Sequence, residues 1–229
     1  MTTSNKTNIA TPNEPSNIWK PEDHIPPELK ESFGLLSKST PANYVINFLH
    51  IIEQLKIQKR TGWLDHNIND CESIADHMYR MGVTCMLLKT PGINRDACVR
   101  IALVHDMAES LVGDITPHDS IKKAEKHRRE FDTIKYITEK LVEPYNKEAA
   151  KQIEEDWLAY ENISSPEARF VKDIDKFELL VQCFAYEKRY GKTDLQQFWG
   201  AVKSIKTDEV KSWAQDLLKQ REEFFSKQK

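Results

Sequence analysis

The chain of 229 residues has few glycines and no long apolar run. Glycine occurs seven times, and no stretch shows the strict two-residue alternation that marks a half-buried strand. Without a long apolar run we expect no membrane-spanning helix. The net charge of -3 and the lack of a basic stripe with interleaved aromatic side chains argue against a nucleic-acid polymer as partner. The sequence therefore predicts an all-α protein that acts on something smaller.

Cysteines are also few, and they show no CxxC pairing. Cys71, Cys85, Cys98 and Cys183 are far apart, and most of them fall within apolar helical patterns. This is typical of reduced thiols in the core of an intracellular protein. No secretory leader pattern is present, and residues 1–40 contain no arginine, which argues against a mitochondrial transit peptide. We expect a cytoplasmic location, with the nucleus as a further compartment.

The length favours one domain over two small ones. Residues 1–38 are rich in Thr, Asn and Pro and are predicted to form a flexible N-terminal arm, in which Ile18 and Trp19 are the residues able to dock locally. Residues 39–229 are predicted to form the folded domain. Helical periodicity and start signals predict helices over about 41–55, 74–89, 94–113, 120–141, 146–161 and 166–190, with two more that begin near Thr193 and Thr207.

The segment Arg100–Asp114 combines apolar and charged side chains in one helical pattern. Its residues His105, Asp106 and Glu109 border Leu, Val and Met side chains, so several of them should be partly buried. An unpaired buried carboxylate costs free energy on the order of several kcal/mol, and a cation satisfies neighbouring acceptors most simply. The segment therefore predicts a divalent metal site on a helix that ends near Gly113.

Other residues strengthen this hypothesis. His77 lies on the preceding predicted helix, and the short Pro91-Gly92 turn can bring it opposite His105. Asp175 lies within an apolar helix, and Glu109 follows His105 by one helical turn on the same face. Two imidazoles with carboxylates suit borderline or hard divalent ions. The alternative for His105 alone is a core histidine hydrogen-bonded to a carbonyl.

The pattern of His77, His105-Asp106 and Asp175 resembles the HD-domain superfamily of metal-dependent phosphohydrolases, and more narrowly the HD-domain 5'-deoxynucleotidases. The similarity covers roughly residues 40–200. The segments that carry it are 72–81 (ESIADHMYRM), 102–109 (ALVHDMAE), 112–115 (VGDI), 126–130 (KHRRE) and 170–176 (FVKDIDK).

The resemblance implies an HD-domain helical bundle over residues 39–229, with C-terminal helices and a metal site between helices. It implies a first divalent ion, Mn²⁺, Co²⁺ or Mg²⁺ with Zn²⁺ or Fe²⁺ as alternatives, because such ligands tolerate all of them. A second, magnesium-like ion is also implied, which gives two ions per chain. The implied ligands are His77, His105, Asp106 and Asp175 for the first ion, and Glu109, Asp114 and the backbone oxygen of Ile115 for the second.

The implied activity is hydrolysis of 2'-deoxyribonucleoside 5'-monophosphates to deoxynucleoside and phosphate. Glu109 is assigned to the attacking water and Asp114 to the leaving oxygen, and these roles can be exchanged. Arg60 and Trp63 are the substrate-binding candidates, because the family places an Arg next to a Trp that packs near the sugar. Two other residues separate them here. The alternative for Trp63 is a hydrophobic plug at a helix end.

Two other functions stay open: a phosphohydrolase of cyclic nucleotides or triphosphates, and a catalytically silent, metal-stabilised binding module. Few spare basic residues argue against a triphosphate, and the extra carboxylates of Glu109 and Asp114 argue against a purely structural site. Apolar residues expected to be exposed on the last helices, together with the family resemblance, predict a homodimer. These residues are Phe198, Trp199 and Trp213.

Several charged residues near the motifs are expected to be exposed. Asp173 lies two residues from Asp175 and hence on another helix face. Lys126 is expected on a solvated face, whereas one of the arginines that follow it is a candidate partner for an acid of the site. His66 and His118 are expected at the surface or in packing.

Overall fold

The computed structural model describes residues 18–36, 40–191 and 195–227, and these fold into helices and turns. The described residues contain no β-strand, only an isolated antiparallel bridge between Lys59 and Ser73, so the all-α prediction is confirmed. The helices are η1 (Pro21–His24), η2 (Pro27–Leu29), α1 (Lys30–Gly34), α2 (Pro41–Ile57), α3 (Thr61–Leu64), α4 (Ile74–Cys85), α5 (Arg95–Val104), α6 (Glu109–Val112), α7 (Lys123–Tyr136), the π-helix η4 (Ile137–Val142), α8 (Lys147–Asn162), α9 (Pro166–Tyr190), η5 (Gln196–Ser204) and α10 (Asp208–Ser226).

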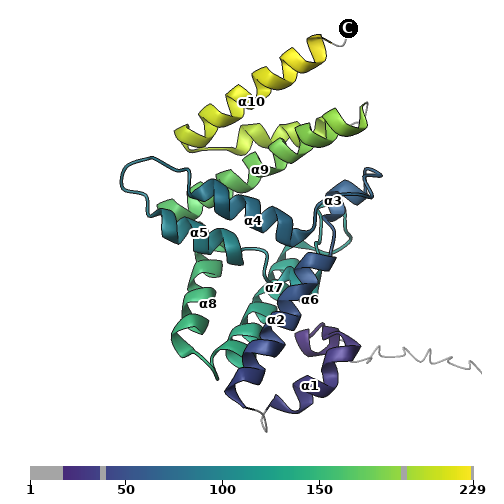
Figure 1. The fold of residues 1–229 in the computed structure, drawn as a ribbon, viewed down its shortest axis with the longest axis vertical. Helices are drawn as coiled ribbons and strands as arrows, with labels where there is room; N and C mark the ends of the chain where they lie inside the picture. Colours follow the sequence, from purple (N-terminus) through teal and green to yellow (C-terminus); the bar gives the residue numbers. More distant parts are fainter. Residues whose placement is uncertain (1–17, 37–39, 192–194, 228–229) are drawn as a thin grey trace, which may run out of the picture.

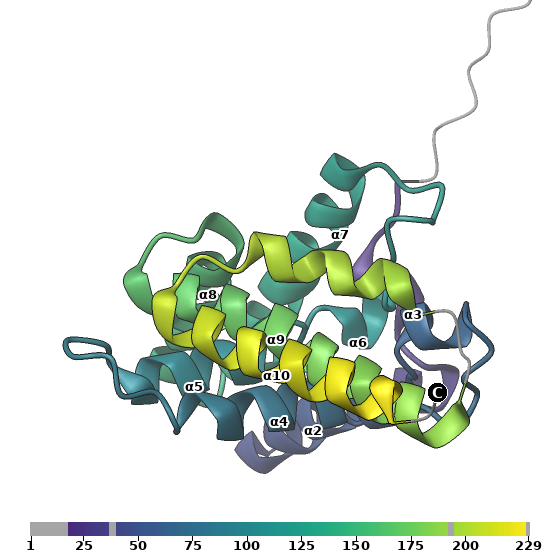
Figure 2. The ribbon, with the colours of Figure 1, turned by 90° about the horizontal axis from the view of Figure 1, so that it is seen from above.

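Helix α9 is the centre of the arrangement. It packs against α4, α5 and α8 and also against η5 and α10. Helix α10 lies at one end of the long axis of the molecule and α1 at the other (Figure 1), and seen from above α10 lies over α9 (Figure 2). None of the helices in the described ranges is both long and apolar enough to cross a membrane.

The helices that carry the site begin at capping residues that the sequence identifies. Ser73 accepts a hydrogen bond from the backbone N–H of Asp76, whose carboxylate accepts one in return, so that α4 starts in a capping box. The side chains of Asn94 and Ser165 cap α5 and α9 by accepting one backbone N–H each, from Ala97 and Ala168. Each such cap stabilises a protein by about 1 kcal/mol. The caps therefore fix the register of the helices that bear the candidate ligands.

The core beneath the site is formed by the apolar faces of α4, α5 and α9. Met81, Ile101 and Ile174 are at most 2% exposed, and burying each such side chain contributes roughly 1.5–3 kcal/mol. The four cysteines are free and buried, as the sequence predicts. The core therefore holds the helices rigidly around the polar cluster described below.

Residues 18–36 differ from the predicted flexible arm. They form short helices, and η1 packs against α6 and α7. Ile25 is buried, the carbonyl of Trp19 accepts hydrogen bonds from Arg128, and the Trp19 ring stacks on His24. Prolines at the first turns favour these 3-10 helices because their φ is already helical. Residues 1–17, 37 and 38 of the predicted arm lie outside the described residues.

The single helix predicted over 94–113 is also wrong, because α5 ends at Val104. The next residues form a tight turn, in which the N–H of Met107 donates to the carbonyl of Val104 over 3.0 Å. Helix α6 is short and ends at Gly113, whose φ of 85° lies in the region that favours glycine. In a continuous α-helix, adjacent side chains diverge by about 100°. The turn lets the neighbours His105 and Asp106 face the same point.

Candidate active site

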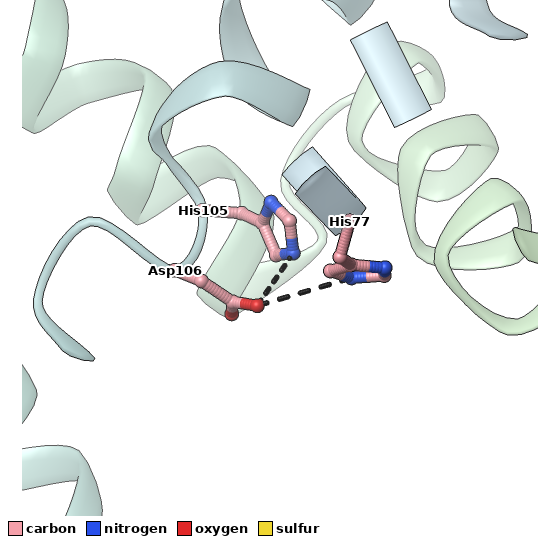
Figure 3. Close-up of side chains that lie close together, drawn as sticks. All are labelled: His77, His105 and Asp106. Atoms are coloured by element: carbon pink, nitrogen blue, oxygen red, sulfur yellow. Dashed lines mark ion pairs between the residues drawn. The ribbon is translucent and has the colours of Figure 1, made fainter. Parts of the chain in front are cut away.

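Three segments bring the four predicted first-ion ligands together. His77 comes from α4, His105 and Asp106 from the turn after α5 (Figure 3), and Asp175 from α9. The Nε2 atom of His105 lies 3.1 Å from Oδ2 of Asp106. The Nε2 atom of His77 lies 3.4 Å from Oδ1 of Asp175 and 3.9 Å from Oδ2 of Asp106. Helices far apart in the sequence thus converge on one His–Asp cluster.

Both histidines are oriented by a second contact. The Nδ1 atom of His77 lies 2.6 Å from the buried carboxylate of Glu178, and that of His105 lies 2.9 Å from the carbonyl of Ala102. These acceptors assign the ring protons to Nδ1. The Nε2 atoms of both rings are buried and have no hydrogen-bond partner in the part of the chain that the structure describes. Two buried ring nitrogens therefore face carboxylates with no hydrogen bond to them, which fits a bound cation.

The electrostatics of the cluster also favour positive charge. Burial alone would raise the pKa of Asp106 and Asp175, but the facing histidines hold both values well below the ordinary range. Burial lowers the pKa of His77, and the carboxylates of Glu178 and Asp175 outweigh this effect and raise it to about 10. The donor set, with two nitrogen and several oxygen atoms, is one that a divalent ion accepts.

Sequence reasoning missed the residues that support these candidate ligands. Glu178 also accepts a hydrogen bond from Nε of Arg80 over 2.6 Å, and Tyr160 donates to Oδ2 of Asp175 over 2.9 Å. A signal for Glu178 was present, because it follows Asp175 by three residues and so lies on the same helix face. Tyr160 stands on another helix, and no spacing in the sequence connects it to Asp175.

A second group of charges faces the cluster, and Arg60 lies at its centre. Its Nη1 atom is 3.4 Å from Asp106, 3.5 Å from Asp114 and 3.9 Å from Glu109. The backbone N–H of Thr61 donates to Asp114 over 2.7 Å. The bridge between Lys59 and Ser73 holds this connector beside the start of α4. Three carboxylates therefore share one guanidinium.

Glu109 is the most unusual acid of this group. It is 3% exposed. Burial and the charges of Asp106 and Asp114 raise the pKa of Glu109 well above its ordinary value, although Arg60 and Lys126 oppose the shift. The shift makes the ionised carboxylate of Glu109 a stronger base than an exposed glutamate.

The prediction of a solvated Lys126 is wrong. Its Nζ atom lies 2.7 Å from the backbone oxygen of Ile115, 3.4 Å from Glu130 and 3.7 Å from Glu109. Helix α7 packs against α6, which turns this face of α7 toward the acids. The arginines that follow pair instead with Glu125 on their own helix. An ammonium group thus already occupies the oxygen of Ile115, which the resemblance assigns to a second ion.

The predicted exposure of Asp173 is wrong as well. Its side chain is fully buried, and Oδ2 accepts hydrogen bonds from the backbone N–H groups of Lys206 and Thr207 over 2.8 and 2.7 Å. The connection between η5 and α10 covers this face of α9. The aromatic residues predicted as exposed on the last helices are also covered: Trp199 is buried, and Phe198 and Trp213 are partly buried.

Trp63 lies beside the charged group rather than within it. It is 1% exposed, its Nε1 donates to Glu72 over 3.0 Å, and its ring contacts those of Tyr186 and Phe198. Two cavities meet near it. One of about 690 Å³ lies over the His–Asp cluster, the other of about 380 Å³ lies beside Trp63, and Arg60 and Asp114 line both.

Fold and site together define the class: an all-α protein with a buried His–Asp cluster that fits a divalent metal ion. The HD domain family matches residues 52–214, and the chain belongs to that family.

Named relatives and solved structures agree with this membership. The chain is 59% identical to the 5'-deoxynucleotidase YGK1 of Saccharomyces cerevisiae, over 91% of this chain and 96% of that protein. It is 48% identical to the 5'-deoxynucleotidase HDDC2 of Homo sapiens, over 70% and 78% of the two chains. A solved structure of the HD domain-containing protein YGK1 superposes with a TM-score of 0.71 at 49% identity, covering 90% of this chain and 99% of that one.

Proposed function

We propose that the protein is a 5'-deoxynucleotidase, a metal-dependent phosphomonoesterase that hydrolyses 2'-deoxyribonucleoside 5'-monophosphates. The observation that carries the proposal is the pair of buried Nε2 atoms, of His77 and His105, that face carboxylates without a hydrogen-bond partner among the described residues. The names of relatives that share about half or more of their residues with this chain support the same activity.

The proposed first-ion ligands are His77, His105, Asp106 and Asp175. When bound, the divalent ion acidifies water and withdraws charge from the phosphoryl oxygens. Mn²⁺, Co²⁺ and Mg²⁺ are the proposed ions, with Zn²⁺ and Fe²⁺ as alternatives. The pairing of each Nδ1 atom supports this assignment, because it leaves both Nε2 atoms available toward the carboxylates.

The residues of the facing group act on the substrate. Arg60 binds the phosphoryl oxygens with its guanidinium, a favourable charge-assisted contact. Glu109 accepts the proton of the attacking water, because its raised pKa makes the ionised carboxylate a stronger base. Asp114, held by the N–H of Thr61, is the acid that assists protonation of the leaving 5'-oxygen. The roles of the two acids can be exchanged. Trp63 forms the wall beside the deoxyribose.

The direct test is phosphate release by the purified protein from paired ribo- and deoxyribonucleoside 5'-monophosphates, with each divalent ion in turn. We expect release from the deoxyribonucleotides, dependence on the ion and weaker release from the ribonucleotides. Cyclic nucleotides and triphosphates in the same panel test the other phosphohydrolase activities. Absence of phosphate release from every deoxyribonucleotide, with metal bound, would favour the silent binding module.

A second ion is part of the proposal, with Glu109, Asp114 and the backbone oxygen of Ile115 as its ligands. Binding there requires Lys126 to leave the Ile115 oxygen, which lies 2.7 Å from its Nζ atom. Calorimetric titration should therefore show that Lys126→Met binds the second Mg²⁺ more tightly than the unchanged protein. Equal affinity would argue against this site.

We also propose a homodimer, now on a different surface. Helix α4 and the turn after it expose apolar side chains that a second copy would cover: Tyr79 and Val83 on the helix, Met86 and Leu87 in the turn. Sedimentation at micromolar concentration tests the dimer, and a monomeric mass would contradict it. A cytoplasmic location, with the nucleus as a further compartment, completes the proposal, and the buried free thiols support it.

A further inference from the structure

Apart from its wall at Trp63, the smaller cavity beside the charged group has no role in the steps above. Its volume of about 380 Å³ lies within the range of about 300–1,000 Å³ for small-molecule sites. It lies between α3, the loop after Asp114 and η5. Because Arg60 and Asp114 line both cavities, one molecule can extend from the larger cavity into the smaller one.

The cavity has an aromatic wall formed by Phe198. The Phe198 ring is half-buried, and its centroid lies 4.7 Å from the ring of Trp63 and 5.0 Å from that of His66. Gly62 faces the same ring, and a β-carbon at this position would lie 3.6 Å from Cε1 of Phe198. A side chain at position 62 would therefore contact this edge of the ring. The part of the ring that lines the cavity can stack with a planar group.

The lining of this cavity includes the carboxylates of Asp65 and Asp114, and His66 and Gln197 form one of its polar edges. Nδ1 of His66 lies 2.8 Å from the carbonyl of Gly62, so Nδ1 donates and Nε2 accepts from the amide of Gln197, which contacts it. Arg60, at the junction, is the sole lysine or arginine among the described lining residues. The lining suits an uncharged planar group with a hydrogen-bonding edge and disfavours a second phosphate.

We infer that this cavity is the nucleobase subsite: Phe198 stacks on the base, and Gln197 and His66 contact its edge. The inference rests on the proposed function, because the phosphate must bind beside Arg60 for the base to reach Phe198. The site then separates its tasks in space. The larger cavity takes the phosphate, Trp63 lines the sugar, and the smaller cavity takes the base.

The test compares Phe198→Leu with the unchanged protein, using two product inhibitors of deoxynucleotide hydrolysis. Deoxyadenosine carries the base, and inorganic phosphate does not. Base–aromatic stacking weakens by roughly 5- to 100-fold when the ring is removed. We expect Phe198→Leu to raise the inhibition constant of deoxyadenosine about 10-fold and to leave that of phosphate within about two-fold. Gly62→Val, which fills the space beside the ring, should act in the same direction.

Phe177→Leu is the matched control. Phe177 is also a partly buried ring on the C-terminal side of the fold, packed against Trp213 and outside both cavities of the site. It should change neither inhibition constant. Equal shifts for both inhibitors in Phe198→Leu, or no shift in either, would overturn the subsite.

The two proposals fail in different ways. If the unchanged protein released no phosphate from any deoxynucleotide, the proposed function would fail. Calorimetric binding of deoxyadenosine to the metal-loaded unchanged protein and to Phe198→Leu then still tests the cavity. Affinity that is measurable and lower in the variant supports the base subsite, and affinity that is absent or equal in both contradicts it.

Discussion

The two sides of the active site differ in how their buried charged groups are paired. On the side formed by α4, α8 and α9, which we call the back wall, the two carboxylates each contact two neutral or cationic groups through separate oxygen atoms. On the side formed by the α3 connector, α6 and α7, the front wall, several acids share two cations. The back wall consists of His77, Arg80, Tyr160, Asp175 and Glu178, and the front wall of Arg60, Glu109, Asp114 and Lys126.

This difference assigns the two walls different tasks. Pairing atom by atom at the back orients the ring nitrogen of His77 and the carboxylate of Asp175 before anything binds. Shared pairing at the front leaves Arg60 able to exchange carboxylates for phosphoryl oxygens. The back wall should therefore control metal affinity, and the front wall should control turnover. Each prediction below tests this division.

The largest effect is expected for His105→Ala, which removes a proposed ligand from the junction of both walls. Activity should fall by at least roughly 1,000-fold, because the acidification of water by the ion is lost. Bound metal, measured by elemental analysis, should fall with it, and helical circular dichroism should stay nearly unchanged. His50→Ala, an exposed histidine on α2, serves as control. A His105→Ala protein that keeps its metal would contradict the assignment of His105 as a ligand.

Glu109→Gln and Asp114→Asn should lower kcat by about 100-fold, the usual size of a lost proton-transfer group. The metal of the first site should remain bound, because neither residue belongs to the proposed first-ion ligands. Turnover and metal content, measured on the same preparation, check this prediction. Simultaneous loss of metal in either variant would show that front and back walls are not separate.

Glu178→Gln should weaken metal binding by about 10- to 100-fold, the usual cost of losing a carboxylate that orients a metal-binding histidine. Saturating metal should restore most of the activity. Glu187→Gln is the matched control, because Glu187 is also buried on α9 and paired with an arginine, Arg221. It should lower stability and leave metal affinity unchanged. Metal titration of the two variants distinguishes orientation from general support of α9.

The last effect concerns the pH dependence of stability, through Glu130. Burial raises the pKa of Glu130 from 4.5 to about 7, although Lys126 opposes the shift. Because the folded state holds this proton more tightly, the free energy of unfolding should fall as pH rises from about 4.5 to about 7. Glu130→Gln should lack that contribution, on the order of 2–3 kcal/mol. Urea unfolding in the presence of a chelator, at pH 5 and pH 8, measures it. Identical pH dependence in both proteins would contradict the buried position.

The sequence predicts the back wall better than the front wall, for a physical reason. His77 and Asp175 stand out because they interrupt apolar helical faces, and the caps at Ser73 and Ser165 fix where those helices begin. Lys126 belongs to a strongly charged helix, in which the sequence does not distinguish a lysine that faces inward from one that faces solvent. Its exposure depends on packing against α6, and helical periodicity carries no information about that contact.

The tight turn at His105 and the burial of Asp173 escaped prediction for related reasons. A turn of this kind has about three residues per turn and an α-helix has 3.6. Over only four residues, both place apolar side chains at the same positions in the sequence. Asp173 is covered by a connection more than thirty residues later in the chain. Glu178, by contrast, was within reach of the sequence, because it shares a helix face with Asp175.

Asp173 and Asp175 lie on one turn of α9, and only one of them points to the reaction. Asp173 instead holds the backbone at Lys206 and Thr207, where the chain enters α10, and no described residue of α10 lines either cavity. A protein shortened before Lys206 would uncover this carboxylate and remove its two backbone N–H donors, two residues from a proposed metal ligand. The last helix therefore sets a minimum length for a working enzyme while remaining remote from its chemistry.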